Sequence, residues 1–551
     1  MGNHKKSNNQ SLYFISPLVL IFTIILLSSC DLTENPSGTL TVQTTPLQNE
    51  SDLNAMVVGA YRSLPEWTGG AGDYGNYMPC SIEFQTGKAT SEDSHPLLFR
   101  FQNDNVTGTL LDDFNVPWER WYQGIRDANF AITRIKEARS NSDIAISESS
   151  LGKALGEVRT LRAFYYFNIV RYYGSAVLDT TYHEGLGNLD KPRTSLKTIY
   201  DEVIIPDLEF AVNESGLEDI PVGANGRLTR YVSRVILADV YLTAAGYPYQ
   251  EVATAPEQNW SEEGLWEMEG YPVQSNSAEQ FLLNAQEQLQ ALYGQYSLGE
   301  LNVNIHDLNG EAIFQAHYNG TEEDNEIVAA ALPSNSRIST FGSEYGTFIP
   351  TEGYINSYDP DDQRLEEDNY FFKEDRVHSS KDASEPFVTF DRRYLAKFYD
   401  EEAIKETGQS SINWTFYRYA DALLMLTEVN WALKELGATA ISNDQIVKGI
   451  NEVRERAGLS GYNASEVDLK AILSERAYEL VFENKMLWDQ RRTRKALVVG
   501  DGEFSELVDL MGHQPRTFSF QLSAKHLLSP IGGTEMQVNP EMTQNFGYTP
   551  Q

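Results

Sequence analysis

The chain has 551 residues, 41% of them hydrophobic, and a formal net charge of −36 at pH 7. A chain of this length can bury a large core, arranged as one or two domains. The excess of acidic side chains argues against nucleic acids and anionic lipid surfaces as ligands, because both would be repelled. The two cysteines, Cys30 and Cys80, show no CxxC or Cys/His spacing, so neither a disulfide framework nor a metal site is predicted.

The first thirty residues have the order of an export signal. Two lysines precede an apolar run at 12–27, and the sequence Leu-Ser-Ser-Cys ends at Cys30. The run contains Pro17 and is shorter than the ~20 residues that a membrane-spanning helix needs. Leu, two small residues and Cys match the lipobox of bacterial lipoproteins, in which the cysteine is acylated and becomes the N-terminus. We therefore predict a lipoprotein signal peptide at 1–29, palmitate-type acylation of Cys30, and membrane attachment through lipid only.

Residues 30–52 are polar and rich in Pro and Thr, which predicts a lipidated tether. From Leu53 onward, apolar residues recur at helical spacing. The predicted helices, in chain order, are 118–136, 151–173, 196–212, 228–245, 278–293, 419–436, 443–457 and 467–488. The last of them is expected to begin with a capping box formed by Ser465 and Asp468.

The predicted helices come in pairs, as in tetratricopeptide (TPR) repeats. Between them, the stretches 64–112, 246–277 and 300–412 show no clear periodicity, and irregular loops of this length are uncommon unless they are functional. We therefore predict a mostly α fold, a TPR-like scaffold of helical pairs with long irregular loops and little β structure.

Motifs of the common enzyme classes are absent from the sequence. It contains no GxSxG, HExxH, GxxxxGK[ST] or GxGxxG-type loop. The segment 359–363 (DPDDQ) has the first acids of a calcium loop but lacks its Gly and its terminal Glu, so a hydrated loop is favoured. Pairs of carboxylates suited to glycoside hydrolysis occur in any chain this acidic, so their presence does not distinguish a glycosidase from a protein without activity. We predict no catalytic residues, no metal and no cofactor.

Charged residues on the predicted helices also invite a catalytic interpretation. Arg and Glu three or four positions apart on a helix, however, pair with each other and with helix ends, so a structural role is favoured. The residues concerned are Arg159, Arg162, Arg418, Asp421, Arg454, Arg456, Glu475, Arg476, Glu479 and Glu483.

Three loops combine aromatic residues with Gly, Asn, Asp or Glu. Sugar-binding sites use aromatic rings as platforms for the apolar faces of the sugar, with polar side chains reading its hydroxyls. Glycines let a ligand approach the backbone. The alternative is that these rings fasten long loops to the core, and the pattern does not distinguish the two. The candidate ligand-binding residues are Trp67, Tyr74 and Tyr77, then Trp260, Trp266 and Tyr271, and finally Phe341 and Tyr345.

Seven segments, in this order, resemble the SusD/RagB family of outer-membrane nutrient-binding lipoproteins. They are 116–132, 157–174, 226–249, 417–430, 450–459, 473–492 and 527–548. Two departures lie in the packing part of the motifs. Asn484-Lys485-Met486 stands where the family usually has a Gly-(His/Arg)-Arg-like segment, and Pro-Ile-Gly-Gly at 530–533 replaces the commoner Pro-Ile-Pro.

The resemblance implies a SusD-like fold, with an N-terminal region at 53–300 and a C-terminal region at 301–551. It implies a protein that binds an oligomeric nutrient, most simply a glycan, and acts as the lid of a SusC-like TonB-dependent transporter. Asp31 and Glu34, just after the cysteine, resemble an acidic export signal, which predicts exposure at the cell surface. A peptide ligand, a lipid-anchored glycan-degrading enzyme and a scaffold that binds only protein remain the alternatives.

Overall fold

The fold is known from a computed structural model. It describes Gly2 and residues 47–64, 78–92, 95–107, 114–141, 143–183, 190–221, 226–246, 249, 278–301, 310–318, 325–334, 336, 338–340, 344–376, 387–406, 410–438, 440–500 and 502–549. The chain from Leu47 to Gln551 forms one compact unit. Apart from Gly2, the predicted signal peptide lies outside the described residues, as do Cys30 and nearly all of the tether. No described helix is long and apolar enough to cross a membrane.

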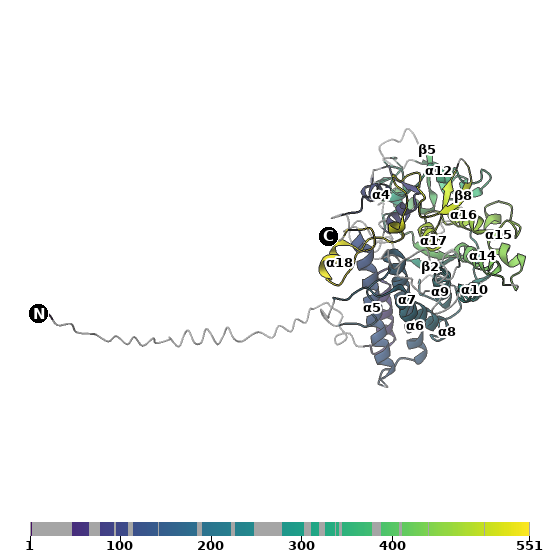
Figure 1. Ribbon diagram of the computed structural model, residues 1–551. Helices are drawn as coiled ribbons and strands as arrows, with labels where there is room; N and C mark the ends of the chain where they lie inside the picture. Colours follow the sequence, from purple (N-terminus) through teal and green to yellow (C-terminus); the bar gives the residue numbers. More distant parts are fainter. Residues whose placement is uncertain are drawn as a thin grey trace. The chain divides into compact units, whose positions relative to one another are not determined.

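The first half of this unit is built from helices that pack in succession, α5 on α6, α6 on α8, α8 on α9 and α9 on α10 (Figure 1). Their bounds are α2 Glu50–Tyr61, α5 Asn115–Arg139, α6 Glu148–Tyr173, α7 Leu196–Ile199, α8 Ile205–Asn213, α9 Arg230–Ala244 and α10 Ala278–Leu292. Between α7 and α8 the chain makes a wide π-helical turn at Tyr200–Ile204. The predicted helical pairs are therefore confirmed.

Helix α6 is more deeply buried than its sequence pattern indicates. The apolar stripe predicted one buried face, but residues on all sides of the helix are covered from 151 to 170. Four of its tyrosines, at positions 165, 166, 172 and 173, are fully buried, and the Tyr165 hydroxyl donates to the Ala60 carbonyl at 2.8 Å. A helix covered on all sides is a core helix, so α6 is the centre around which the N-terminal helices pack.

The C-terminal helices are α14 Tyr419–Glu435, α15 Asn443–Arg456, α16 Leu469–Glu479 and α17 Met486–Thr493. The prediction of one helix at 467–488 is wrong, because the chain turns between α16 and α17 with positive φ at Phe482 (58°) and Asn484 (60°). The turn brings the Asn484 backbone N–H to Glu83, to which it donates at 2.8 Å. A tertiary contact therefore overrides the helical periodicity.

The predicted start of α16 is also wrong. Asp468 itself is the N-cap, and its carboxylate accepts from the Ala471 N–H at 2.8 Å, so Ser465 lies outside the helix. A reciprocal capping box is present instead at the start of α15, between Ser442 and Gln445. Gly532, one of the departures from the family pattern, serves packing, since a Cβ there would lie 1.9 Å from Asn115 Oδ1.

The long stretches expected to be irregular contain short elements, so that expectation is wrong in part. The described strands form four two-stranded antiparallel sheets: β1 Ala89–Thr90 with β3 Ile349–Pro350, β2 Ala312–Ala316 with β6 Trp414–Arg418, β4 Phe371–Arg376 with β5 Phe387–Leu395, and β7 Lys495–Val499 with β8 Phe504–Asp509. Short helices accompany them: α3 Met78–Glu83, α4 Pro96–Gln102, α11 Ile327–Ala331, α12 Glu352–Ile355, α13 Glu401–Lys405 and α18 Gly533–Val538. The strands are few and short among the described residues, which confirms the prediction of a mostly α fold with little β structure.

A buried ionic network joins the C-terminal helices to the β2–β6 sheet. Arg418 donates to Glu311 at 2.6 Å and to Glu483 at 2.8 and 2.9 Å. Arg364 contacts Glu475 and Glu479 at 2.8 and 3.2 Å. The side chains of these six residues are at most 2% exposed. The structural role predicted for the helical charges is confirmed, although these partners lie on other elements rather than three or four positions along the same helix.

The positive charges of this network hold two of its carboxylates, Glu479 and Glu483, in the ionised form. Burial alone would raise the pKa of Glu479, but Arg456 and Arg418 hold it well below its usual value. Burial acts in the same way on Glu483, and Arg418 with Lys397 lowers its pKa to about 2. A buried carboxylate is stable only with such partners, so the network acts as a unit.

Candidate functional site

The predicted ligand-binding residues fall mostly outside the described part of the chain. Trp67, Tyr74, Tyr77, Trp260, Trp266, Tyr271 and Phe341 all lie there, so their placement stays a prediction. Tyr345 is described. Two further features are suited to a ligand: an aromatic surface on the β4–β5 hairpin near α11, and a polar cavity at the start of α16.

Tyr345 is held in place by its backbone. Its N–H donates to the Ala329 carbonyl in α11 at 2.9 Å. The next residue, Gly346, has φ +61°, and a Cβ there would lie 2.8 Å from both the Ser334 nitrogen and Glu92 Oε2, so only glycine fits. The Tyr345 ring is half-buried, and burial together with Glu326 raises the pKa of its hydroxyl. A fixed, half-exposed ring could serve either as a platform for a sugar or as a contact that fastens its loop to the core.

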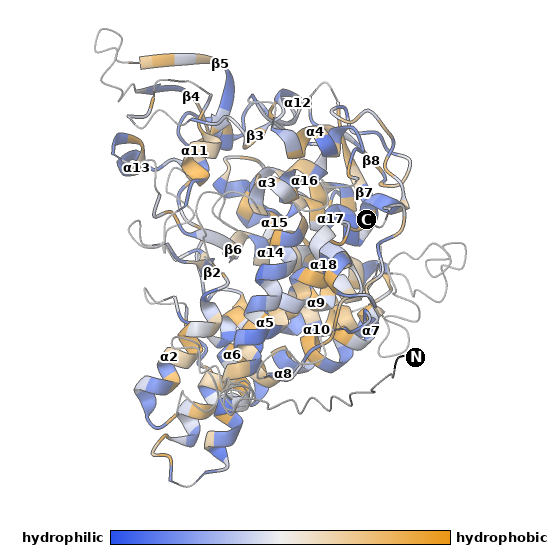
Figure 2. Ribbon diagram, turned by 90° about the vertical axis from the view of Figure 1, so that its left-hand side faces the viewer, coloured by the Kyte–Doolittle hydropathy of each residue, from blue (hydrophilic) through white to orange (hydrophobic). Residues whose placement is uncertain are grey.

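The β4–β5 hairpin, which lies near α11 in Figure 2, carries a group of aromatic side chains. Phe372 and Tyr394 belong to a buried cluster that α11 completes with Val328. Phe390 packs on this cluster, with its ring centroid 5.2 Å from that of Tyr394, while remaining partly exposed.

Tyr399 extends this group to the outside, since it packs 5.9 Å from Phe372 and is partly exposed. Val388 also packs on the cluster, whereas Phe387, which is 55% exposed, lies on the opposite face of β5. We call Val388, Phe390 and Tyr399 the hairpin surface.

Carboxylates lie beside the rings of the hairpin. The Tyr399 hydroxyl donates to Asp375 at 2.9 Å, and the Thr389 hydroxyl donates to Glu374 at 3.1 Å. Glu92 accepts from the Tyr394 hydroxyl and from the Ser334 N–H, and so ties the hairpin to the segment before Tyr345. Aromatic faces next to hydrogen-bond acceptors are the combination that binds a sugar ring.

The polar cavity at the start of α16 has a volume of about 310 Å³. This is within the size range of small-ligand sites. Its polar and aromatic lining consists of Asp359, Asp362, Arg454, Tyr462, Glu466, Asp468, Lys470, Ser474, Tyr478, Glu503 and Phe504. The Arg454 guanidinium lies 3.9 Å from the centroid of the Tyr462 ring, and Asn451 bonds both the N–H and the carbonyl of Tyr462. The walls are therefore preorganised.

Most carboxylates of this cavity are already engaged. Asp362 accepts from Arg364 at 2.7 Å, Asp468 caps α16, and Glu466 accepts from the Asn463 N–H. No group of three or more His, Cys, Asp or Glu within the described ranges is arranged to hold a metal ion. Asp362, which belongs to the calcium-loop-like segment 359–363, therefore serves the ionic network.

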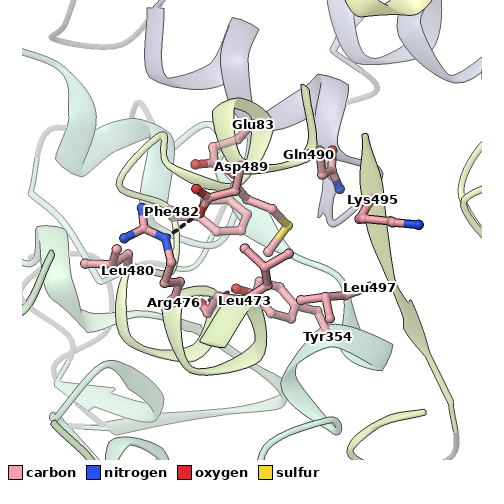
Figure 3. Close-up of a pocket in the computed structure, with 12 residues that line it drawn as sticks. Glu83, Tyr354, Leu473, Arg476, Leu480, Phe482, Asp489, Gln490, Lys495 and Leu497 are labelled. Carbon is pink, nitrogen blue, oxygen red and sulfur yellow. Dashed lines mark hydrogen bonds and ion pairs between the residues drawn. The ribbon is translucent and has the colours of Figure 1, made fainter. Parts of the chain in front are cut away.

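A second, narrow space lies between α3, α16 and α17 (Figure 3). At about 20 Å³ it holds little more than one water molecule. Arg476 and Asp489, joined by a 2.7 Å ion pair, line it together with Glu83, which is 2% exposed. Burial raises the pKa of Glu83 to about 8, against the opposing effect of the Asn484 N–H. This space belongs to the core, not to a ligand site.

Sequence reasoning missed the cavity at α16. Its residues come from four separate segments, and Tyr462 stands in a short link between two helices, where no periodic pattern marks it. The aromatic content of the hairpin was visible in the sequence, but it lay within the long stretch predicted to be irregular.

Comparison with known proteins places the chain among similar sequences and folds. Residues 379–548 match the family model described as the SusD family, and residues 42–214 match one described as starch-binding associating with outer membrane. A SusD-like protein of Formosa agariphila is 23% identical over 478 residues, covering 81% of this chain and 82% of that protein.

Two solved structures extend this likeness to the fold. A SusD superfamily protein from Parabacteroides distasonis is 31% identical, with a TM-score of 0.75, and the match covers 93% of this chain and 100% of that one. Surface glycan-binding protein A from Bacteroides thetaiotaomicron, solved in complex with laminarihexaose, is 17% identical, with a TM-score of 0.62 and coverage of 90% and 99%.

Proposed function

Because this chain belongs to the SusD/RagB family, we propose that it is a cell-surface lipoprotein that binds an oligosaccharide and delivers it to a TonB-dependent transporter of the outer membrane. Family membership makes the chain a binding protein rather than an enzyme. Its role is to capture a ligand unchanged and release it to the transporter, for which it acts as the lid.

The observation that carries the glycan proposal is the hairpin surface with its carboxylates. Phe390 and Tyr399 are partly exposed rings on a rigid base, and Asp375 lies beside Tyr399 and accepts a hydrogen bond from its hydroxyl. The fold is shared over most of its length with a protein solved in complex with laminarihexaose, which supports an oligosaccharide as the ligand. Trp67, Trp260 and Trp266 remain candidate platforms for the ligand.

A glycan array followed by calorimetric titration tests the proposal. Phe390→Ala should weaken binding of the selected oligosaccharide by about 1–3 kcal/mol, roughly tenfold to hundredfold, because the variant removes apolar contact area. Leu283→Ala is the matched control, since Leu283 is 39% exposed on α10, away from the hairpin. Unchanged affinity in both Phe390→Ala and Tyr399→Ala would exclude this surface.

The same titrations separate the alternatives. Release of reducing ends in proportion to the protein, surviving repurification, would favour the glycan-degrading enzyme. Binding of peptides with no glycan bound would favour a peptide-binding member of the family. Ala variants of the three tryptophans distinguish platforms from loop fasteners, because a platform variant loses affinity and a fastener variant loses thermal stability.

Anchoring depends on Cys30 in this proposal. Cys30→Ala should release the protein from the membrane fraction of cells that lack the transporter, because no other lipidation site is proposed. Protease treatment of intact cells tests surface exposure. A variant that still sediments with outer membranes in those cells contradicts the lipid anchor.

A further inference from the structure

A third cavity, of about 220 Å³, opens beside the β1–β3 sheet, and its lining is basic in a chain whose net charge is −36. Lys88, His513 and Arg516 are the ionisable groups among its described lining residues, and none of those lining residues is acidic. The cavity lies apart from the hairpin surface and from the polar cavity at α16, with which it shares no lining residue.

Lys88 is the unusual member of this group. Its side chain is 4% exposed, and its ammonium donates to the neutral carbonyl of Leu497 at 2.8 Å. The ring of Phe504 lies 5.8 Å away, and no carboxylate within the described residues forms an ion pair with Lys88. An ammonium has three donors, and a buried charge without an opposite charge is costly.

The neighbouring Arg516 increases that cost. Burial, and after it the charge of Arg516, lowers the pKa of Lys88 to about 8. Burial and the charge of Lys88 also lower the pKa of His513, which favours its neutral form. Lys88 and Arg516 are therefore close enough to repel each other, and an anion bound at Lys88 would relieve this repulsion and favour protonation of His513.

The cavity walls are rigid and leave little freedom for the lysine to reach another partner. The Lys88 carbonyl accepts from the Thr351 N–H at 2.8 Å. Gly87 has φ +72°, and a Cβ there would lie 2.4 Å from Pro515, so the loop that carries Arg516 packs directly on the lysine's own segment. Arg516 is exposed at the outer end, which gives an ion a path from solvent.

We propose that this cavity is an oxyanion site, in which Lys88, with His513 and Arg516, binds the sulfate or carboxylate group of an acidic sugar. The sugar as the source of the oxyanion rests on the proposed function, whereas the site itself does not. The cavity is large enough for a tetrahedral oxyanion with water molecules. Lysine acts on such groups as a point charge and arginine as a bidentate donor.

Inorganic sulfate is the first probe, compared with chloride at constant ionic strength. Millimolar sulfate should raise the melting temperature of the full chain, and calorimetry should detect binding that is at least about tenfold weaker in Lys88→Met. The variant should fold, because methionine keeps the buried apolar stem and removes a charge that lacks a carboxylate partner. Arg516→Gln, at the exposed mouth, should weaken sulfate binding less.

Arg126→Gln, which changes an arginine with a 61% exposed side chain on α5, is the matched control and should bind sulfate as the wild type does. The absence of sulfate binding in the wild type, or equal binding by wild type and Lys88→Met, overturns the site.

A second arm identifies the source of the oxyanion. Among oligosaccharides on the array, those bound should carry sulfate or carboxylate groups, and their preference over the desulfated or neutral form should disappear in Lys88→Met. If only neutral glycans bind, with equal affinity in both proteins, the acidic sugar is excluded and the cavity takes free anions. If no glycan binds, the proposed function fails. The comparison of inorganic sulfate binding between wild type and Lys88→Met still tests whether the cavity is an oxyanion site.

Discussion

Glu83 makes the stability of this chain depend on pH in the direction opposite to most carboxylates. Its side chain is buried at the turn between α16 and α17, where burial raises the pKa to about 8. In the unfolded chain the carboxyl ionises near its ordinary value, so the folded state holds a proton that the unfolded state has lost. The stability that this residue contributes is therefore fully present at low pH and decreases as pH rises through about 8.

Glu83→Gln isolates this effect. Glutamine keeps an oxygen to accept the Asn484 N–H but cannot ionise, so the variant should gain stability relative to wild type as pH rises from about 5 to 9. Urea unfolding at several pH values measures the difference. A constant difference between the two proteins across that range would show that Glu83 is ionised in the folded state.

At the scale of elements, helix ends and turns separate what local sequence determines from what distant contacts impose. The helices could be predicted because their apolar residues recur every three to four positions. The turn between α16 and α17 could not be predicted in this way. Asn484 has a positive φ there, and its N–H is bonded to Glu83, which lies 401 positions away in the sequence. Strands β7 and β8 could not be predicted either, because they are short and their sequences show no alternation of apolar and polar residues.

The N-cap of α16 gives a direct test at this scale. Asp468→Ala should lower the free energy of unfolding by about 1 kcal/mol, because the Ala471 N–H loses its acceptor. Ser465→Ala is the control, since Ser465 lies outside the helix although the sequence predicted it as the cap. Chemical denaturation compares the two variants, and an equal loss in both would restore the predicted capping box.

At the scale of the whole molecule, ligand sites were harder to predict than the fold. The candidate aromatics were found because Trp and Tyr beside Gly form a local pattern, and of these Tyr345 is placed, half-buried next to α11. The basic cavity has no local pattern, because Lys88 and Arg516 are brought together by the fold. The ionic network was predicted in its role, but its partners depend on the tertiary arrangement of Arg418 and Glu311.

This network should govern unfolding in acid. The folded pKa of Glu483 is about 2, because Arg418 and Lys397 outweigh burial, and that of Glu479 is well below its usual value. The folded-state pKa values of both carboxylates are lowered. Their contribution to stability is therefore present above the pKa of the unfolded chain and is lost as pH falls from about 4.5 toward 2.

Glu483→Gln tests the acid prediction. The variant should lose several kcal/mol at neutral pH, because Arg418 and Lys397 keep buried charge with one carboxylate fewer, and its stability should fall less steeply between about pH 4.5 and 2. Glu137→Gln is the control, since Glu137 is half exposed in a pair with Arg134. Denaturant unfolding as a function of pH measures both slopes. Equal slopes in wild type and Glu483→Gln would mean that Glu483 does not contribute to the acid sensitivity of the fold.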